Sequence, residues 1–474
     1  MEQTSPRIAA KDKVPVGQKL AYAAGGSVEM LSAASVGTMW MPVFNLGFGI
    51  SPGILGMIGV IYRIWDAVTD PVIGNMSDNT RTRWGRRRPY IFVGAVLVAI
   101  TTPMLWRLSP SWSEMSMLVY ITVIGLLLHT SLSIWAMPYN SLMLEMTPNY
   151  DERTRISAYR TIFMKFGVLI GSWILPFAAS PFFASPETGK PDLVRGVQII
   201  SIALAAGTIM LGVLPAIFIP ERYYEKEASK QAKEPLIQGI RDSFHLRPLW
   251  MLVSIVVFQV FGNGLTSAMG FYINLYYVNH GKLTDAAVIE GFKGTTAFLV
   301  GLAAVPFWTW VCEKLDKKWT LMIIVSSGFI SAGLNLVCLT PSHPYLQLIP
   351  AVFYASVTAS IWLILPSMLA DIVDFDELKT YRRREGNINA VFSWFLKFGM
   401  TIAMGLSGFL LEWTGFDAKA GDQPQVVLQR MLYLYVLLPA FFWVIAVLLI
   451  RIYPLNRKKM TEIRGELEAR RGAV

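Results

Sequence analysis

The stretch Arg63-Ile64-Trp65-Asp66-Ala67-Val68-Thr69-Asp70-Pro71 decides how this chain folds. It lies inside an apolar run that extends from Pro52 to Met76. Asp66 and Asp70 are spaced i, i+4 and Arg63 lies three before Asp66, so a helix projects all three from one face. An ionised side chain at membrane depth costs about 2.5–3.5 kcal/mol even on a lenient scale. This face is therefore expected to look into a bundle interior or a water-filled cavity.

The composition indicates a polytopic membrane protein. Of the 474 residues, 54% are hydrophobic and 16% are charged, whereas soluble domains have about 45–50% and about 25%. The net charge of +10 comes from basic residues in short segments between apolar runs, which argues against a nucleic-acid-binding face. Two cysteines, Cys312 and Cys338, provide no disulfide framework or metal site. The N-terminus lacks the apolar core of a signal peptide, so the first span is expected to be retained.

Apolar runs long enough to cross a bilayer recur along the whole chain. They predict twelve transmembrane helices, near residues 18–46, 52–76, 89–106, 116–145, 156–178, 197–219, 248–279, 285–312, 319–340, 344–372, 387–412 and 427–452. Lys and Arg gather in every second loop, while 45–51 and 108–114 carry none. By the positive-inside rule, both termini are expected in the cytoplasm.

The longest polar connection, residues 220–247, predicts a cytoplasmic loop between two six-helix bundles, 1–219 and 248–474, the second with a short basic tail. An internal repeat supports this division. Met137-Pro138 is followed by Glu145 and Lys165-Phe166-Gly167, and Leu365-Pro366 is followed by Asp371 and Lys397-Phe398-Gly399. Such repeats are typical of secondary transporters. The expected fold is an all-α polytopic membrane protein with two pseudo-symmetric bundles.

Asp66 and Asp70 are the leading candidates for a cation site, because carboxylates that line a cavity can hold Na⁺ or carry H⁺. The alternative is a structural ion pair with Arg63, although two acids against one local base leave a negative charge. Lys397, well inside the eleventh span, is the candidate distant partner. A bound cation would compete with Lys397 and so favour one conformation; the alternative is a lysine that snorkels to the surface.

Other polar and aromatic residues within the spans are candidate contacts for a sugar, whose hydroxyls need donors and acceptors and whose ring face stacks on aromatic rings. These are Glu29, Trp135, Asn140, Arg160 and Trp362. The competing interpretation is that each tryptophan packs in the core and that Arg160 anchors a helix at the membrane edge. His129 and the other histidines show no metal-ligand spacing.

Charged clusters at the predicted cytoplasmic ends suggest a gate. Asp78 with Arg81 and Arg83 forms one cluster, and Asp371 and Asp374 with the following arginines form its counterpart; orientation signalling is the simpler alternative. No nucleotide-binding motif, nucleophile–base set or metal-ligand cluster is evident, so we expect neither ATP-driven transport nor an enzyme, and no cofactor beyond a coupling ion.

With these motifs in place, the whole chain resembles the major facilitator superfamily and, within it, the glycoside–pentoside–hexuronide:cation symporters. The likeness is most specific in residues 63–71 with 80–85, and in 370–374 with Lys397. It implies that Asp66 and Asp70 bind the coupling cation and contribute to the sugar site. It also implies that Arg160 lies near that site and that Trp362 belongs to the sugar pocket.

Three departures from the family pattern affect the choice of ion and sugar. Ala136 stands where the family has a carboxylate, so H⁺ coupling becomes at least as good an expectation as Na⁺ coupling. Thr69 replaces an asparagine, although its hydroxyl and that of Ser133 can still supply oxygens. The family's sugar-binding acid aligns with Met30, and Glu29 lies one position early, which is about 100° around the helix.

The resulting hypothesis is cation-coupled (H⁺ or Na⁺) symport of a sugar or glycoside by alternating access. The expected setting is a bacterial inner membrane, with the protein as a monomer that binds no nucleic acid. One alternative is a facilitator for an amphipathic solute, such as a lysolipid or drug. The other is a membrane sensor that transports nothing, although the chain shows no appended soluble domain to mark it.

Overall fold

A computed structural model describes residues 13–147, 149–185, 189, 191–221, 245–381, 384–420 and 422–471. Within these ranges the protein is built from helices, and the one pairing of β type is an isolated bridge between Ala184 and Pro191. The predicted all-α class is therefore confirmed. The chain divides into two compact units, the first with residues 1–50 and 58–232 and the second with residues 51–57 and 233–474.

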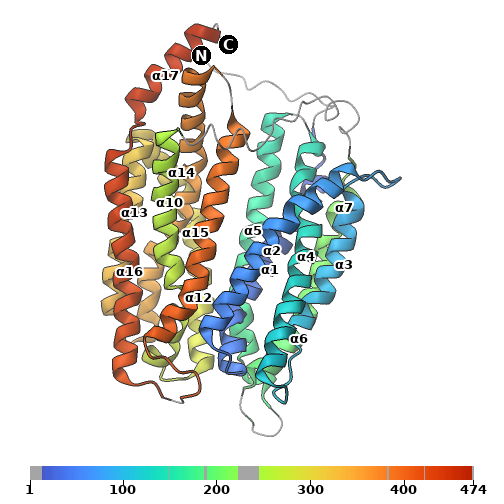
Figure 1. Ribbon diagram of the computed structural model, residues 1–474, viewed down its shortest axis with the longest axis vertical. Coiled ribbons are helices and arrows are strands. Elements are labelled where there is room, and N and C mark those ends of the chain that lie inside the picture. Colours follow the sequence, from blue (N-terminus) through green and yellow to red (C-terminus); the bar gives the residue numbers. More distant parts are fainter. Residues whose placement is uncertain are drawn as a thin grey trace. The chain divides into compact units, whose positions relative to one another are not determined.

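The first unit places α1 against α5, and α3 against α4 and α6 (Figure 1). Its elements are α1 (Val16–Met41), η1 (Pro42–Gly47), α2 (Pro52–Asn79), α3 (Arg88–Leu105), α4 (Glu114–Met146), α5 (Tyr150–Ala178), η2 (Pro181–Phe183), α6 (Leu193–Gly212) and α7 (Leu214–Phe218). Proline recurs inside these helices, at Pro71, Pro103, Pro138 and Pro176. Neighbouring helices in a membrane bundle can satisfy the backbone groups that such prolines free.

In the second unit, α10 packs on α15 and α16, and α14 packs on α12 and α13. The elements are α10 (Arg247–Leu265), α11 (Ser267–Tyr272), η3 (Ile273–Val278), α12 (Leu283–Lys314), α13 (Lys317–Cys338), η4 (Pro344–Gln347), α14 (Leu348–Thr380), α15 (Glu385–Trp413), α16 (Gln425–Ile452) and α17 (Arg457–Arg471). The first residues of α2, which group with this unit, are held by α15, because the Gly53 amide donates to Glu412 Oε1 at 3.0 Å.

Ten helical segments in the described residues are long and apolar enough to cross a membrane. α1 and α2 are also long enough, at 26 and 28 residues, but both carry charges within their length, and neither belongs to the ten. With these two, the described long helices match the twelve predicted spans. Most of the predicted loop 220–247 lies outside the described residues, at 222–244.

The two units share internal features that confirm the predicted pseudo-symmetry. Each unit has a six-residue π-helix near its start. η1 directly follows α1, and η3 follows α10 after the short helix α11. Each π-helix contains an Asn-Leu pair, and the asparagine amide donates to a backbone carbonyl, Asn45 to Ile50 and Asn274 to Ala286, both at 2.8 Å. α4 and α14 have 33 residues each, and α5 and α15 have 29 each.

Close packing of α3 on α4 gives a stability prediction. A Cβ atom on Gly94 would lie 2.6 Å from the backbone nitrogen of Trp135, whereas one on Gly207 in α6 would meet nothing within 4 Å. Gly94→Ala should therefore push the two helices apart and destabilise the protein by about 1–3 kcal/mol. The measurement is the melting temperature of the purified protein, with Gly207→Ala as the matched control. Equal melting temperatures would contradict the packing argument.

Candidate functional site

α2 carries its acidic pair close to the middle of the helix. Asp66 is 14 residues after Pro52 and 13 before Asn79, which at 1.5 Å per residue is about 20 Å from either end. Both carboxylates are only partly exposed and face α4. The binding role of the pair stays a prediction. A helix of 28 residues is long enough to span a hydrocarbon core, and the pair lies near its middle.

Asp66 forms its principal contact with His129 of α4, whose Nδ1 lies 2.9 Å from Asp66 Oδ1. The side chains of Asp66 and His129 are 20% and 19% exposed. Arg63 lies 3.7 Å from the second carboxylate oxygen and is more exposed. The imidazole also packs on Tyr62, with ring centroids 4.8 Å apart. Asp66 is thus flanked by an imidazole and a guanidinium.

Asp70 accepts a hydrogen bond from a hydroxyl group of α4. Ser133 donates to Asp70 Oδ1 at 2.6 Å, and the Ser133 and Thr69 hydroxyl oxygens lie 3.2 Å apart. Ala136, one turn further along α4, adds no oxygen. Among the residues that the structure describes, no group of three or more His, Cys, Asp or Glu side chains could hold a metal ion.

A second polar cluster links α1, α4 and α5. Arg160 Nη2 lies 2.6 Å from Glu29 Oε2 and 2.6 Å from Asn140 Oδ1. The guanidinium also stands over the ring of Tyr139, 5.3 Å from its centroid, and Tyr139 stacks on Tyr22. The side chains of Arg160 and Glu29 are 21% and 27% exposed, so both can reach a solute. The structure therefore brings together three of the predicted substrate residues.

One face of α4 serves both clusters. His129, Ser133, Ala136 and Asn140 follow one another at intervals of four, three and four residues, which places them in one stripe along a helix. Its first two members contact the acids of α2, and its last contacts Arg160. The residue that the sequence interpretation missed is His129. Its spacing of four from Ser133 was the signal that could have found it.

The other predicted site residues lie elsewhere. Trp135 is 1% exposed and its indole nitrogen donates to the Gly212 carbonyl at 3.1 Å, so this side chain packs in the core of the first unit. Trp362 on α14 and Lys397 on α15 belong to the second unit and are exposed. Lys397 forms no ion pair with any described residue.

In the first unit, the predicted gate cluster uses different arginines. Asp78 is paired with Arg87, Nη2 to Oδ1 at 2.9 Å, and Arg86 and Arg87 both bind the buried Glu145. Glu221 accepts hydrogen bonds from the backbone amides of residues 86–88. Arg81 and Arg83, which the sequence interpretation had grouped with Asp78, are exposed and form no ion pair with the described residues.

In the second unit, the predicted gate acids Asp371 and Asp374 both form ion pairs with α17, a helix that the sequence interpretation treated as a tail. Asp371 lies 2.6 Å from Lys317 and 3.3 Å from Arg464 of α17, and Asp374 lies 3.8 Å from Arg464. The expected arginine partners are not those observed, since Arg384 pairs with Asp376 at 2.7 Å and residues 382–383 lie outside the described residues.

Two pseudo-symmetric bundles of long apolar helices, with charged clusters at membrane depth, define a multi-pass membrane transporter. The solved structure of the nucleoside transporter NupG has a similar fold, with a TM-score of 0.63, 13% identity and coverage of 92% of this chain and 99% of that one. The family model described as MFS/sugar transport protein matches residues 21–457. The chain belongs to this family.

Its relatives are symporters and sugar transporters by name. The uncharacterized symporter YnaJ of Bacillus subtilis is 29% identical, over 97% of this chain and 96% of its own length. The isoprimeverose transporter of Lactiplantibacillus pentosus is 25% identical, over 88% and 84%. The sodium-dependent lysophosphatidylcholine symporter 1 of Xenopus tropicalis is 23% identical, over 97% and 91%. By their names these relatives are symporters or transporters, and the solutes that two of the names give are of different kinds.

Proposed function

We propose that this protein couples the entry of protons to the uptake of a sugar or glycoside by alternating access across a bacterial inner membrane. The observation that carries the proposal is the contact of 2.9 Å between His129 and Asp66 in the middle of two membrane helices. Both groups can bind a proton, and an ionisable pair at this depth needs a function to offset its cost.

The number of oxygen ligands available beside Asp66 and Asp70 favours H⁺ over Na⁺ as the coupling ion. Hard cations are held by several oxygen ligands. Here one oxygen of Asp66 accepts from His129 and one oxygen of Asp70 accepts from Ser133. Ala136 offers no side-chain oxygen at the position where a third carboxylate would complete the set. A proton needs no such shell, because it binds a single carboxylate oxygen and removes the charge that His129 and Arg63 stabilise.

The cluster of Arg160, Glu29 and Asn140 is the proposed sugar site of the first unit. It presents a fork of N–H donors, a carboxylate and an amide, which suit adjacent hydroxyl groups. The ring of Tyr139 below Arg160 is buried, so it orients the guanidinium rather than stacking on the sugar. Asp66 and Asp70 contribute to the same site from α2. In the second unit, we propose the exposed Trp362 as a sugar-binding residue in its own right.

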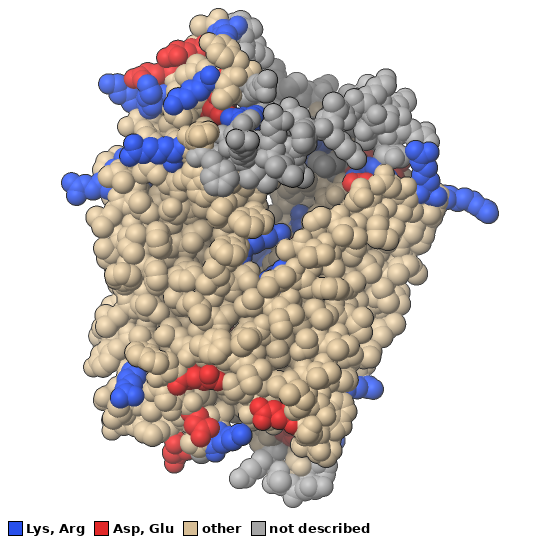
Figure 2. Space-filling model, in the orientation of Figure 1, with Lys and Arg blue, Asp and Glu red and all other residues tan. Residues whose placement is uncertain are grey.

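We assign both termini and α17 to the cytoplasm. Figure 2 shows Lys and Arg gathered at the end of the second unit that carries α17, above a flank with few charged residues. Excess Lys and Arg in short loops marks the cytoplasmic side. One ion-paired cluster in each unit supplies the proposed cytoplasmic gate residues, Asp78 with Arg87 in the first and Asp371 with Lys317 in the second.

Lys397 is a further residue that we propose takes part in coupling. It is a cation within a membrane helix, exposed, and without an ion pair among the residues that the structure describes. A cation at membrane depth is costly, so we expect Lys397 to serve in transport rather than in packing.

A lysophospholipid is the second candidate substrate. It is favoured by the likeness to the sodium-dependent lysophosphatidylcholine symporter and by exposed apolar side chains beside the acids, such as Ile64 and Trp65. This candidate changes both the solute and the expected ion, so one experiment can separate the two.

The test uses purified protein in proteoliposomes, with a pH gradient or a Na⁺ gradient imposed separately at constant ionic strength. Labelled xylosides and glucosides form one panel, and labelled lysophosphatidylcholine forms the other. We expect glycoside accumulation with the pH gradient and none with Na⁺ alone, and we expect His129→Gln to weaken this response. Uptake that follows only Na⁺ would overturn the choice of ion. Uptake of the lysophospholipid without any glycoside would establish the second candidate.

A further inference from the structure

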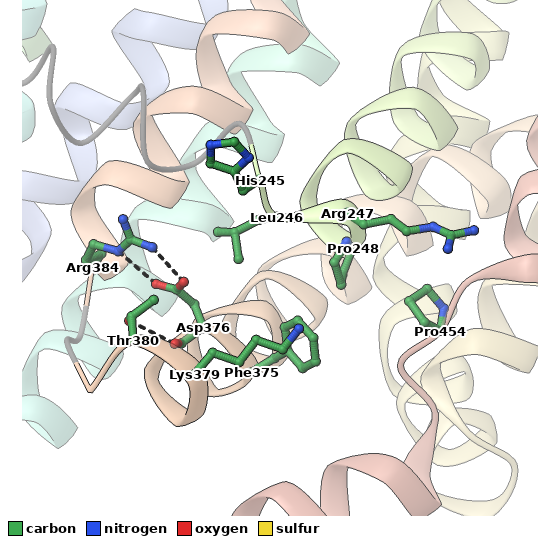
Figure 3. Close-up of a pocket in the computed structure, with 10 residues that line it drawn as sticks. All are labelled: His245, Leu246, Arg247, Pro248, Phe375, Asp376, Lys379, Thr380, Arg384 and Pro454. Carbon is green, nitrogen blue, oxygen red and sulfur yellow. Dashed lines mark hydrogen bonds and ion pairs between the residues drawn. The ribbon is translucent and has the colours of Figure 1, made fainter.

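The second unit contains a cavity that belongs to neither cluster described above. Its volume is about 730 Å³, and it lies where α10 and α15 begin and α14 ends. The lining residues are His245, Leu246, Arg247, Pro248, Phe375, Asp376, Lys379, Thr380, Arg384 and Pro454 (Figure 3). All of them belong to the second unit, so the cavity is complete within it.

The lining is positive, with Arg247, Lys379 and Arg384 against the single acid Asp376. Arg384 is held by Asp376 through two hydrogen bonds, at 2.9 and 2.7 Å, which leaves that pair neutral. Arg247 and Lys379 therefore supply the net positive charge of the lining. Both are exposed, and neither has an ion-pair partner among the described residues. Lys379 Nζ lies 4.3 Å from the ring centroid of Phe375, which directs the ammonium group along the wall.

The dipoles of two helices add to the positive potential in the cavity. α10 begins at Arg247 and α15 at Glu385, and neither helix has a side-chain hydrogen bond that caps its N-terminus. The N-terminus of a helix carries roughly half a positive charge and favours anions. Two such termini at the edge of one cavity, together with Arg247 and Lys379, form a site to which a phosphate group is complementary.

The remaining lining is apolar. Leu246 and Pro248 are buried, and Phe375 and Pro454 complete the apolar surface (Figure 3). A bare inorganic ion would leave this surface without a partner, and the volume exceeds what one phosphate needs. Basic pockets among membrane helices on the cytoplasmic side are suited to the headgroups of anionic lipids.

We propose that this cavity binds the phosphate group of an anionic ligand through Arg247 and Lys379, with an apolar or glycerol portion against Leu246, Pro248 and Phe375. The two sources of such a group are an anionic phospholipid headgroup and a soluble phosphate monoester. Arg384 and Asp376 hold the wall in place as a neutral pair. The cavity shares no residue with the acids on α2 or with the cluster of Arg160, so its ligand can be tested separately from the coupling ion and the sugar.

The experiment compares the full-length protein in nanodiscs of phosphatidylcholine, in nanodiscs that also contain phosphatidylglycerol, and in phosphatidylcholine nanodiscs with added glycerol 1-phosphate. Bound ligand is measured by native mass spectrometry and the melting temperature by fluorescence. We expect phosphatidylglycerol, glycerol 1-phosphate or both to bind and to raise the melting temperature. The probe that binds identifies the source of the phosphate.

The variant Arg247→Gln/Lys379→Gln should weaken this binding about tenfold, the effect of losing roughly 1.4 kcal/mol of interaction. The matched control, Arg451→Gln/Lys458→Gln, removes the same charge from exposed positions outside the cavity and should leave binding unchanged. Equal weakening in both variants would show a nonspecific effect of charge and overturn the proposal. So would the absence of binding by either probe. Neither result depends on transport.

Discussion

Asp66→Asn is expected to abolish accumulation of the substrate while the protein still reaches the membrane. A membrane potential of about 100 mV is worth about 2.3 kcal/mol for each proton charge, which supports roughly 50-fold accumulation of a solute that enters with one proton. Without the carboxylate, that coupling is lost, and the internal concentration should rise only to the external one. The measurement is steady-state uptake of labelled glycoside in vesicles with an imposed potential.

The physical reason lies in the partners of Asp66. His129 donates to its carboxylate across 2.9 Å and Arg63 lies 3.7 Å away. Asparagine keeps the size of the side chain and can still accept a hydrogen bond through its amide oxygen, so the helix contact can persist. It cannot take up or release a proton in the working pH range. The fold is therefore expected to survive and the coupling to fail.

Asp70→Asn should give the same loss, because Asp70 shares the network of Ser133 and Thr69 on the same helix face. Glu114→Gln is the control, since Glu114 is an exposed acid in the first turn of α4, outside both clusters. Normal accumulation in both aspartate variants would refute the assignment of the cation site to α2. Exchange of labelled substrate without a gradient should persist at saturating concentration, because asparagine can still form hydrogen bonds with a sugar, and this separates lost coupling from lost binding.

The sequence was sufficient for the features that a membrane imposes on composition. Apolar runs, basic loops and a repeated charge pattern predicted an all-α chain with two related halves, and the helices and paired π-helical segments agree. Charges inside apolar runs also pointed to Asp66, Glu29 and Arg160, because an ionised group at that depth is rare enough to be informative.

The sequence was not sufficient for choosing partners among many similar residues. His129 lies 63 residues from Asp66 and resembles any helical histidine until the two helices are placed together. The arginines near Asp78 are all candidates by distance along the chain, yet Arg86 and Arg87 approach it while Arg81 and Arg83 remain exposed. Trp135 was a candidate sugar contact from the sequence alone. In the structure it is a core residue, because α3 covers it at Gly94.

Arg160→Lys is expected to raise the KM for glycoside about 10- to 100-fold with little change in the amount of protein in the membrane. Hydrogen bonds to charged groups are worth about 1.5–3 kcal/mol, which corresponds to that range. Arg160 contacts Glu29 and Asn140 through the same terminal nitrogen, each at 2.6 Å. The Nε atom of the guanidinium is buried, so contact with sugar hydroxyl groups falls to the terminal nitrogens, and a lysine ammonium cannot reproduce their planar geometry. Arg155→Lys, five residues earlier on the same helix and exposed, is the matched control.

A purely structural role for the pair can be distinguished from contact with the sugar. If Arg160 and Glu29 only neutralise each other, the double variant Glu29→Gln/Arg160→Gln removes both charges together and should restore stability and uptake relative to either single variant. If the two side chains bind the solute, the double variant should fold as well as the wild type, by melting temperature, and still fail to take up glycoside at low concentration. Recovery of uptake in the double variant would therefore remove Arg160 and Glu29 from the sugar site and leave that role to the acids of α2 and to Trp362. We expect the opposite, because Arg160 and Glu29 remain partly exposed beside a buried tyrosine pair, whereas a pair that served packing alone would be expected to be enclosed.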